Sequence, residues 1–441
     1  MVLPFRKIPG PKSKEIIAIS EDVEPASMAD QVPVVWDHGE GVWVWDVDGN
    51  KYIDFTSGVL VTNLGHSHPK HVKAIREQAG RLMNCYSFRT VERVELSRRL
   101  LEILPDNINK AFILTTGSEA TEAALRIAKR ASGKHEVLSF WGGFHGRTYG
   151  AMSVSGNVGT RRKFGPALPG GIMAPYANCY RCVYEKKYPE CNFHCINVLD
   201  RVIASSSSGD VGAVITEPYQ GGAGFIFPPE GWLKQLETWA KDRGYILIVD
   251  EVQSSFGRTG KMFAIDHENV KPQMICLGKG IGSGIPSSAL CGEQQIFSAM
   301  NPGEMSSTTG GNPLSSAGSL AVLDIMRDEQ IPENSEAQGK YLKERLLGLM
   351  KKYTFLDDVR GSGLVIGLEI TEGDKEKTPA KNTMKNIINA AAENGLLLGS
   401  VGLFGNVIRI APPLIINRNE IDIAVDILDR AMHQVNDKLL I

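Results

Sequence analysis

Strand and helix patterns alternate along the middle of this chain, and this alternation is the feature that most limits its fold. From about residue 110, short apolar runs typical of buried strands are separated by stretches with helical spacing. Such alternation predicts an α/β domain with a mostly parallel sheet flanked by helices. The predicted strands are Ala111–Leu114, Glu136–Phe140, Val211–Thr216, Tyr245–Val249, Met274–Leu277 and Ser288–Cys291, with helices at Glu119–Ser132 and Gly231–Arg243.

The two ends of the chain carry a different pattern, which predicts a smaller α+β domain. Alternating residues around Asp48-Gly49-Asn50 indicate a hairpin. Beyond Pro332, helical and strand-like stretches no longer follow the earlier rhythm. At 441 residues the chain has room for two or three domains. We expect an N-terminal arm and hairpin at 1–64, a large cofactor-binding domain at 65–332, and a C-terminal small domain at 333–441.

Composition excludes several classes of protein. Hydrophobic residues make up 42% and charged residues 22%, as in ordinary globular proteins. The net charge of −2 gives no electrostatic case for nucleic acid, and no apolar run reaches the roughly 18 residues of a membrane span. The first seven residues lack the pattern of a signal peptide, so we expect a cytoplasmic protein.

Two short segments bring a carboxylate and an amine to strand ends. Asp250 follows the run Tyr245–Val249, and Lys279 follows the run Met274–Leu277 between two glycines. In a parallel sheet both would arrive at the carboxyl edge, where ligands bind. A lysine can form a Schiff base with a carbonyl and an aspartate can keep a pyridine nitrogen protonated, as pyridoxal phosphate requires. Taken separately, either residue could be a cap or a surface charge.

Two glycine-containing segments follow the first two strands. In Thr115-Thr116-Gly117-Ser118-Glu119, the glycine, the serine hydroxyl and a helix N-terminus could bind phosphate, although a plain helix cap has the same sequence. In the segment 141–148, flanking glycines leave Phe144 and His145 able to face a planar ligand, and Arg147 could hold a carboxylate. The alternative for the second segment is a glycine-rich turn with core aromatics.

Six motifs in order resemble one enzyme family. They are Gly-Ser-Glu-Ala at 117–120, Phe-His-Gly-Arg-Thr at 144–148, Thr-Glu-Pro at 216–218, Val-Asp-Glu-Val-Gln at 249–253, Gly-Lys-Gly at 278–280 and Thr-Thr-Gly-Gly-Asn-Pro at 308–313. Together they are similar to the class III (omega) aminotransferases of the fold type I pyridoxal-phosphate architecture. The resemblance covers nearly the whole chain and is greatest to the 4-aminobutyrate aminotransferase branch.

The resemblance implies a role for each matching position. Lys279 and Asp250 would be catalytic: the lysine would form the Schiff base and move a proton, and the aspartate would pair with the ring nitrogen. Thr308 would reach the phosphate in the neighbouring subunit, which implies a homodimer or a tetramer built from dimers. The implied cofactor-binding residues are Gly117, Ser118, Phe144, His145, Glu217, Asp250, Val252, Gln253, Lys279 and Thr308.

The implied substrates are an amino donor and a 2-oxo acid acceptor, expected to be 2-oxoglutarate. Arg147 resembles the residue that holds the distal carboxylate of 4-aminobutyrate, Arg409 resembles the one that holds an α-carboxylate, and Val59 would also contact substrate. One position departs from the pattern: Gly222 stands where the 4-aminobutyrate enzymes carry a glutamate that pairs with the second arginine. This leaves the donor open between ω-amino acids and α-amino acids.

Other functions remain open from the sequence. Some relatives of this branch racemise amino acids on the same scaffold, so an amino-acid racemase or epimerase is the alternative activity. A non-enzymatic binding module would not need both Asp250 and Lys279. A dinucleotide-binding oxidoreductase is disfavoured because no G-x-G-x-x-G follows the first strand of the alternating region.

A cluster of cysteines has no role in this chemistry. Cys179, Cys182, Cys191 and Cys195 give the spacing C-x2-C-x8-C-x3-C, which could suit structural zinc or an iron–sulfur centre. The alternative is a loop with unligated thiols, which we favour because the catalytic scheme has no use for a metal.

Overall fold

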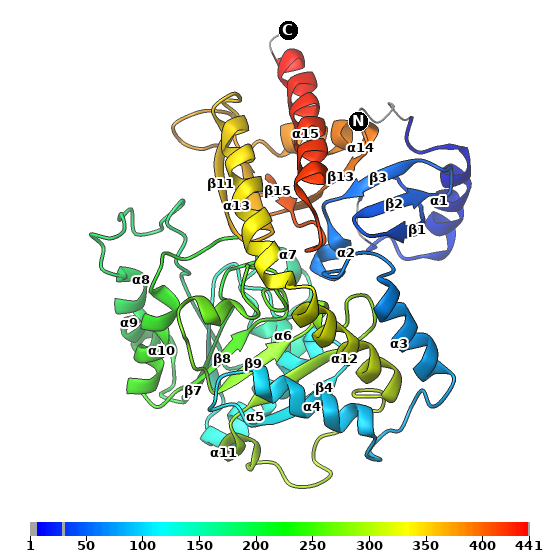
Figure 1. The fold of residues 1–441 in the computed structure, drawn as a ribbon. Coiled ribbons are helices and arrows are strands. Elements are labelled where there is room, and N and C mark those ends of the chain that lie inside the picture. The colour runs from blue at the N-terminus through cyan, green and yellow to red at the C-terminus, as the bar shows by residue number, and fades with distance from the viewer. Residues whose placement is uncertain (1–6, 29–30, 440–441) are drawn as a thin grey trace. The chain divides into compact units, whose positions relative to one another are not determined.

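The computed structural model of the chain describes residues 7–28 and 31–439. Residues 1–6, which carry most of the segment used to exclude a signal peptide, lie outside the described residues. The chain divides into two compact units (Figure 1). Unit 1 comprises Met1–Pro69, Gly257–Gly260 and Gln330–Ile441, and unit 2 comprises Lys70–Phe256 and Lys261–Glu329. The domain boundaries expected from the sequence stay predictions.

Unit 2 is built on a seven-stranded, mostly parallel sheet with the order β4-β10-β9-β8-β7-β5-β6. The strands are β4 (Lys110–Leu114), β5 (Glu136–Phe140), β6 (Gly171–Ala174), β7 (Val211–Thr216), β8 (Ile246–Asp250), β9 (Met274–Leu277) and β10 (Ser288–Gly292). All six predicted strands are present within one residue of their expected bounds. The strand that sequence analysis missed is β6, which has four residues and lies at the sheet edge.

Several loops leave the same edge of this sheet because most of its strands run in the same direction. Strands β5 to β9 pair in parallel, while β10 runs antiparallel to both β9 and β4. Strand β4 therefore points the same way as β9. The segments that follow β4, β5, β7, β8 and β9 all leave the carboxyl edge, where open α/β sheets bind their ligands.

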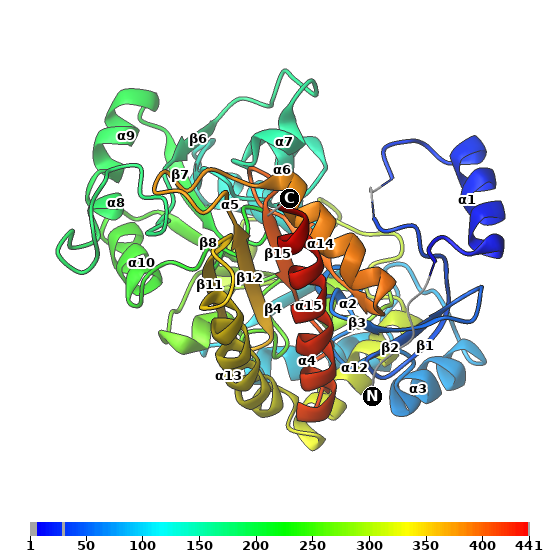
Figure 2. The same cartoon turned by 90° about the horizontal axis from the view of Figure 1, so that it is seen from above.

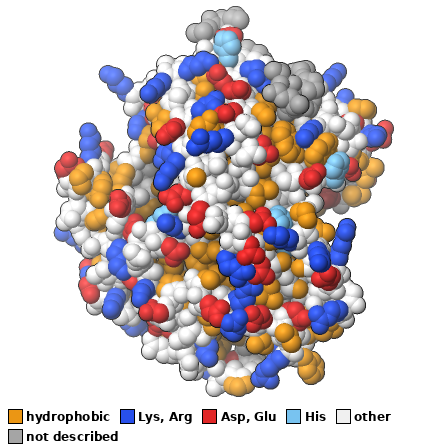
Figure 3. Space-filling model, in the orientation of Figure 1, with side chains coloured by type: hydrophobic (Ala, Val, Ile, Leu, Met, Phe, Trp, Pro, Cys, Tyr) orange, Lys and Arg blue, Asp and Glu red, His pale blue; other side chains and the backbone are white. Residues whose placement is uncertain are grey.

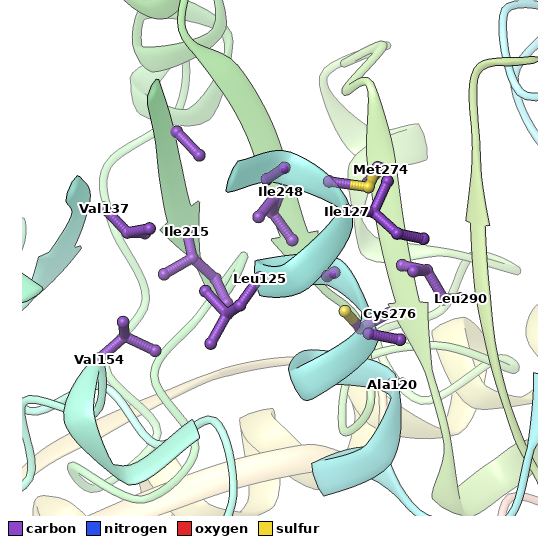
Figure 4. Packing of buried hydrophobic residues seen from close by; sticks show 14 of the residues in the cluster. Ala120, Leu125, Ile127, Val137, Val154, Ile215, Ile248, Met274, Cys276 and Leu290 are labelled. Atoms are coloured by element: carbon purple, nitrogen blue, oxygen red, sulfur yellow. The ribbon is translucent and has the colours of Figure 1, made fainter. Parts of the chain in front are cut away.

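Helices cover the sheet because its strands are apolar on both faces. Every residue of β5, β7, β9 and β10 is buried, as expected for strands between helical layers. Helix α5 (Gly117–Ser132) packs against β7 to β10, and Figure 4 shows Leu125 and Ile127 of this helix within a cluster that includes Ile215 and Ile248. The other helical segments are α3 (Pro69–Ala79), α4 (Val91–Ile103), α6 (Tyr149–Ser153), α7 (Val158–Arg161), α8 (His194–Asn197), α9 (Leu199–Ser206), α10 (Trp232–Asp242), η1 (Ala264–His267), η2 (Lys279–Ile281), α11 (Gln294–Phe297) and α12 (Pro313–Asp328).

Unit 1 contains two four-stranded sheets with helices. One sheet has the order β1-β2-β3-β13 and contains the predicted hairpin, and the other has the order β11-β12-β15-β14. The strands are β1 (Trp36–Glu40), β2 (Trp43–Asp46), β3 (Lys51–Asp54), β11 (Leu356–Ser362), β12 (Val365–Ile370), β13 (Leu396–Leu397), β14 (Gly399–Val401) and β15 (Val407–Ile410). The helices are α1 (Pro11–Val23), α2 (Ser57–Leu60), α13 (Ile331–Met350), α14 (Lys381–Glu393) and α15 (Arg418–Leu439). Helices α14 and α15 pack against each other (Figure 2).

The surface carries charges of both signs. In the face shown in Figure 3, lysine and arginine side chains alternate with aspartate and glutamate, in keeping with the small net charge. No helix among residues 7–28 and 31–439 has the length and apolar content needed to cross a membrane.

Candidate active site

The segment after β4 begins α5 with a well-formed cap. The Thr116 hydroxyl accepts the Glu119 N–H at 3.2 Å, and the Glu119 carboxylate accepts the Thr116 N–H at 3.1 Å. Gly117 and Ser118 are the first two residues of the helix, where N–H groups and positive potential favour an anion. Thus the cap considered as an alternative is present and still leaves a helix start suited to phosphate.

The segment after β5 packs back onto the start of α5. The backbone N–H of Arg147 donates to Ser118 Oγ at 3.2 Å, so the two glycine-containing segments lie side by side. Phe144 is half-buried and lies 5.8 Å from the exposed Arg147 guanidinium, measured from ring centroid to Cζ. The aromatic ring and the guanidinium are therefore both accessible at the carboxyl edge.

A buried ion pair joins the segments after β5 and β8. His145 Nδ1 lies 2.8 Å from Asp250 Oδ2, and both side chains are at most 5% exposed. Burial alone would lower the pKa of His145, but the hydrogen bond and the charge of Asp250, with Glu217 nearby, raise it above its ordinary value. The backbone N–H of His145 donates to Ser155 Oγ at 2.9 Å. Asp250 is thus held in orientation by the His145 ring.

Glu217 follows β7 and holds two loops together. Its carboxyl group accepts the Phe144 N–H at 2.9 Å and the Gly221 N–H at 3.0 Å. Burial raises the pKa of Glu217 to about 7, with the charge of His145 opposing that shift. Since the carboxyl oxygens bind backbone groups, Glu217 positions the segment that carries Phe144.

Val252 and Gln253 follow Asp250 in the segment that leaves β8 at the carboxyl edge of the sheet. A Cβ on Gly117 or on Gly278 would lie 2.7 or 2.9 Å from Val252 Cγ1, so both glycines permit close packing against this valine. A Cβ on Gly221 would collide with the Gln253 amide. Gln253 Oε1 is buried and has no hydrogen-bond partner among the described residues. An unmet buried acceptor is costly unless a ligand satisfies it.

Lys279 follows β9, the strand adjacent to β8. In the parallel register Asp250 lies opposite Cys276, three residues before Lys279. Lys279 has a positive φ of 46° at the start of η2. Non-glycine residues rarely adopt this conformation, and the residues that do are concentrated at functional sites. The structure therefore brings the predicted lysine and aspartate to neighbouring strand ends.

Thr308 belongs to the segment between α11 and α12. Its side chain is exposed in the segment before α12, and neighbouring Ser307 reaches Glu119 at 3.4 Å. The remaining predicted residues, Val59 and Arg409, belong to unit 1. Arg409 lies on β15 and is 7% exposed, and its Nε has no hydrogen-bond partner in the described part of the chain. Burial lowers the pKa of Arg409, whereas the charge of Asp54 acts in the opposite direction.

Gly222 packs close to the segment that carries Phe144. A Cβ at this position would lie 3.2 Å from Phe144 Cβ and 3.5 Å from Asn157 Nδ2, and the backbone φ is not positive. A larger residue would therefore press on the segment that carries Phe144. The departure from the 4-aminobutyrate pattern therefore lies beside Phe144.

The four cysteines line one small pocket of about 20 Å³ together with Tyr184 and His194. Burial raises the pKa of Cys195 to about 11, so its thiol stays protonated near neutral pH. No group of three or more histidine, cysteine, aspartate or glutamate side chains in the described ranges is arranged to hold a metal ion. The structure thus gives no support to a metal site at this cluster.

The buried carboxyl group of Glu251 should make the free energy of unfolding depend on pH. Burial raises the pKa of Glu251 to about 8, so the folded state binds more protons than the unfolded state between the ordinary value of 4.5 and that value. The contribution of this group to the free energy of unfolding is therefore greatest below about pH 4.5 and falls as the pH rises toward about 8. We expect Glu251→Gln to remove a decline of a few kcal/mol across this window, measured by chemical denaturation.

The matched control for this prediction is Glu190→Gln, which changes an exposed glutamate. This control should retain the wild-type slope of stability against pH. An unchanged slope in Glu251→Gln would contradict the role given to the buried carboxyl.

Sequence reasoning missed some residues that shape the site. Ser155 holds the His145 backbone, and Glu122 accepts the Ala151 N–H at 3.0 Å and a hydrogen bond from the Thr148 hydroxyl. Both act on backbone groups across loops, for which no local sequence signal exists.

Comparison with known proteins agrees with this geometry. The family model described as "Aminotransferase class-III" matches residues 25–432. The chain is 36% identical over 431 residues to a leucine/methionine racemase of Thermococcus litoralis, covering 97% of both chains. It is 37% identical over 394 residues to an acetylornithine aminotransferase of Methanopyrus kandleri, covering 89% of this chain and 92% of the relative.

Two further relatives extend the comparison. A probable 4-aminobutyrate aminotransferase of Bacillus subtilis is 35% identical over 403 residues, which cover 89% of this chain and 92% of the relative. The solved structure of a Bacillus anthracis aminotransferase superposes with a TM-score of 0.90 at 30% identity, covering 96% of this chain and 99% of that one. The predicted fold type I architecture is confirmed. Because the family model matches residues 25–432 and these relatives cover most of the chain, the chain belongs to the class III aminotransferase family.

Proposed function

We propose that the protein is a pyridoxal-phosphate-dependent aminotransferase. It would move an amino group from an ω-amino acid or an α-amino acid to a 2-oxo acid, with 2-oxoglutarate as the expected acceptor, by a ping-pong mechanism. The observation that carries the proposal is the delivery of Asp250 and Lys279 by adjacent parallel strands to one edge of the sheet. Membership of the class III family supports the choice of cofactor.

The residues at this edge fit pyridoxal phosphate. Gln253 offers a buried acceptor with no partner among the described residues, and Phe144 presents a half-buried ring suited to stacking. Gly117 and Ser118 at the start of α5 suit a phosphate group. Asp250, Val252 and Lys279 would complete the binding set in this unit. When bound, the cofactor supplies an electron-withdrawing ring that stabilises negative charge at the substrate Cα.

The chain's own residues would then perform three tasks. Asp250, held by His145, would keep a proton on the ring nitrogen because an ionised carboxylate favours the protonated pyridine. Lys279 would hold the cofactor, and its amine would act as the base at the substrate Cα. Glu217 would keep the Phe144 backbone in place through its hydrogen bond.

Two arginines are proposed to bind substrate carboxylates. Arg409 is buried and lines a pocket of unit 1. Its Nε has no hydrogen-bond partner among the described residues, and a substrate carboxylate would supply one. Arg147 is exposed and would take the second carboxylate of a dicarboxylic acceptor. Arg409 is the better supported of the two carboxylate-binding residues, because a buried guanidinium without a partner costs free energy.

Arg409→Met tests this assignment. We expect KM for substrates with an α-carboxylate to rise about 10²-fold, since charge-assisted hydrogen bonds are lost, with a smaller change in kcat. A primary amine that lacks a carboxylate provides the control and should keep its KM. Equal losses for both donors, measured by steady-state kinetics, would contradict the assignment.

A homodimer is also proposed. Exposed apolar side chains are found in the segment between α3 and α4 and in the first turn of α4, and the Tyr86 hydroxyl bonds to Ser306 in the segment that carries Thr308. An apolar patch beside Thr308 supports a partner subunit at this position. The exposed side chains of the patch are Leu82, Met83, Tyr86, Phe88, Val91 and Val94. Assembly of dimers into tetramers and a cytoplasmic location likewise stay proposals.

The second candidate function is an amino-acid racemase or epimerase. Gly222 lacks the carboxylate of the 4-aminobutyrate enzymes, and the racemase of Thermococcus litoralis matches nearly the whole chain. The two activities differ in where the substrate proton returns, and either would use Lys279 and Asp250. A single-enantiomer amino acid incubated with 2-oxoglutarate separates them. An aminotransferase forms glutamate and a new 2-oxo acid in equal amounts, whereas a racemase forms the opposite enantiomer and no glutamate.

A further inference from the structure

Four of the seven cysteines line one small pocket of unit 2, and the proposed reaction uses none of them. Three belong to the segment between β6 and α8, and Cys195 lies in α8 itself. All seven cysteines fall in the described ranges, and each carries a free thiol. Cys179 is exposed, whereas Cys182, Cys191 and Cys195 are half-buried. The pocket therefore has one thiol open to solvent beside three that are partly covered.

The thiols of this pocket are close enough to affect one another's ionisation. Burial raises the pKa of Cys179, and the charges of Cys182 and Cys191 raise it further, with Cys182 having the larger effect of the two. Burial is also the main cause that raises the pKa of Cys195 to about 11, and Cys179 and Cys191 add to that shift. Cys179 thus lies near each of the other three thiols, and Cys182 is the neighbour that acts on it most strongly.

This grouping suits thiol–disulfide exchange. Only a thiolate attacks a disulfide, so the raised pKa makes Cys179 slow but not inert near neutral pH. Once an outside disulfide has reacted with it, a second thiol held nearby displaces the attached group more readily than a thiol free in solution. Among the described lining residues, Lys186 is the one with a permanent charge near neutral pH. Its positive charge favours an anionic reactant.

We propose that this pocket is a site of reversible disulfide formation, in which a small anionic disulfide such as oxidised glutathione oxidises Cys179 and Cys182. The Cys179 thiolate attacks one sulfur of the oxidant, so a mixed disulfide forms and one glutathione leaves as its thiolate. Cys182 then loses its proton and attacks the Cys179 sulfur, which releases the second glutathione thiolate. The two protein thiols lose two electrons and two protons, and the oxidant becomes two molecules of glutathione.

Tyr176 connects this pocket to the candidate active site. Its side chain lines the pocket and is 6% exposed. Its hydroxyl donates to the backbone carbonyls of Glu217 at 3.1 Å and Pro218 at 3.2 Å. Glu217 in turn accepts the Phe144 N–H. A disulfide in the pocket changes the wall that Tyr176 shares, so oxidation should disturb the Glu217 backbone and slow the reaction. This consequence rests on the proposed function, whereas formation of the disulfide does not.

The first test treats the reduced holoenzyme with oxidised glutathione and maps its disulfides by mass spectrometry. Trypsin cuts after Arg181, so Cys179 and Cys182 fall in different peptides and their disulfide is detected as a cross-linked pair. We expect this pair to form and to disappear when dithiothreitol is added. Seven free thiols after the treatment, or a disulfide between other cysteines, would overturn the proposal. The cross-linked pair in a protein that converts no amino donor would support the site and contradict only the proposed function.

The variant Cys182→Ser separates the two steps of the exchange. Serine is similar in size to cysteine but cannot displace the attached glutathione, so the mixed disulfide on Cys179 should accumulate at least about tenfold above its level in wild type. Cys85→Ser changes a half-buried cysteine outside the pocket. This matched control should form the same cross-linked pair as wild type. A mixed disulfide that accumulates no more in Cys182→Ser than in wild type would contradict the role of Cys182.

The variant Tyr176→Phe tests the connection to the active site, because it keeps the ring and removes the hydroxyl that holds the Glu217 backbone. We expect oxidation to lower kcat of wild type about threefold to tenfold and to change kcat of Tyr176→Phe by less than about twofold. The matched control is Tyr188→Phe, since the Tyr188 hydroxyl donates to the Glu230 carbonyl at 3.1 Å from the same segment. This control should respond to oxidation as wild type does. Full activity of the oxidised wild type, or equal sensitivity of Tyr176→Phe, would contradict the connection.

Discussion

Replacing Lys279 with alanine is expected to abolish turnover while leaving the protein folded. The variant would remove the amine that holds the cofactor and the base that moves the substrate proton. We expect kcat to fall by about 10⁴-fold or more, because nucleophilic and acid–base contributions are lost together. Alanine at this site should not disrupt the core, since Lys279 is only half-buried and follows the buried strand β9.

Steady-state rates and unfolding midpoints of Lys279→Ala measure the two parts of this prediction. Lys271→Ala, which removes an exposed lysine paired with Asp106 at 2.7 Å, is the control and should keep full activity. Retained turnover in a pure preparation of the Lys279 variant would refute the catalytic role. A variant that fails to fold would be recognised by its unfolding curve.

Asp250→Asn is the second large effect that we expect. The substitution keeps the size of the side chain but removes the carboxylate, which lies 2.8 Å from His145 Nδ1 and would keep the ring nitrogen protonated. Loss of one preorganised charge in a buried site typically costs about 10²-fold to 10³-fold in kcat. The same change should lower the pKa of His145, because the hydrogen bond and the negative charge that raise it are gone.

The pKa of His145 provides a readout that does not depend on turnover. Nuclear magnetic resonance titration of the imidazole in wild type and in Asp250→Asn should give a lower value in the variant. Asp106→Asn, at an exposed aspartate, should change neither kcat nor this pKa. Wild-type kcat in Asp250→Asn would contradict the proposed pairing with the ring.

Much of unit 2 could be predicted because most of its strands are continuous apolar runs. Every expected strand from β4 to β10 is present, since buried parallel strands leave a strong local pattern. Strand β6 was missed because Gly171–Ala174 is short and follows a glycine-rich stretch. Helix α1 was also missed, since Pro11–Val23 has a weak apolar pattern in a proline-rich arm.

The sequence predicted which loops carry the residues of the candidate site, but it did not predict the contacts between their side chains. The motif spacing indicated that Asp250 and Lys279 would share an edge, and the parallel register of β8 and β9 agrees. The pairing of Asp250 with His145 joins residues 105 positions apart, which no local pattern encodes. The left-handed turn at Ser57–Leu60 was unpredictable for a related reason: its strain is supported by residues distant in sequence, such as Ala411.

The central claim, that Lys279 carries pyridoxal phosphate at the carboxyl edge of this sheet, can be tested directly. The purified holoenzyme is reduced with borohydride, which fixes the cofactor on the lysine that holds it, and its peptides are analysed by mass spectrometry. We predict a single modified peptide, containing Lys279. Modification of a different lysine, or of none in a protein that still transfers amino groups, would contradict the account.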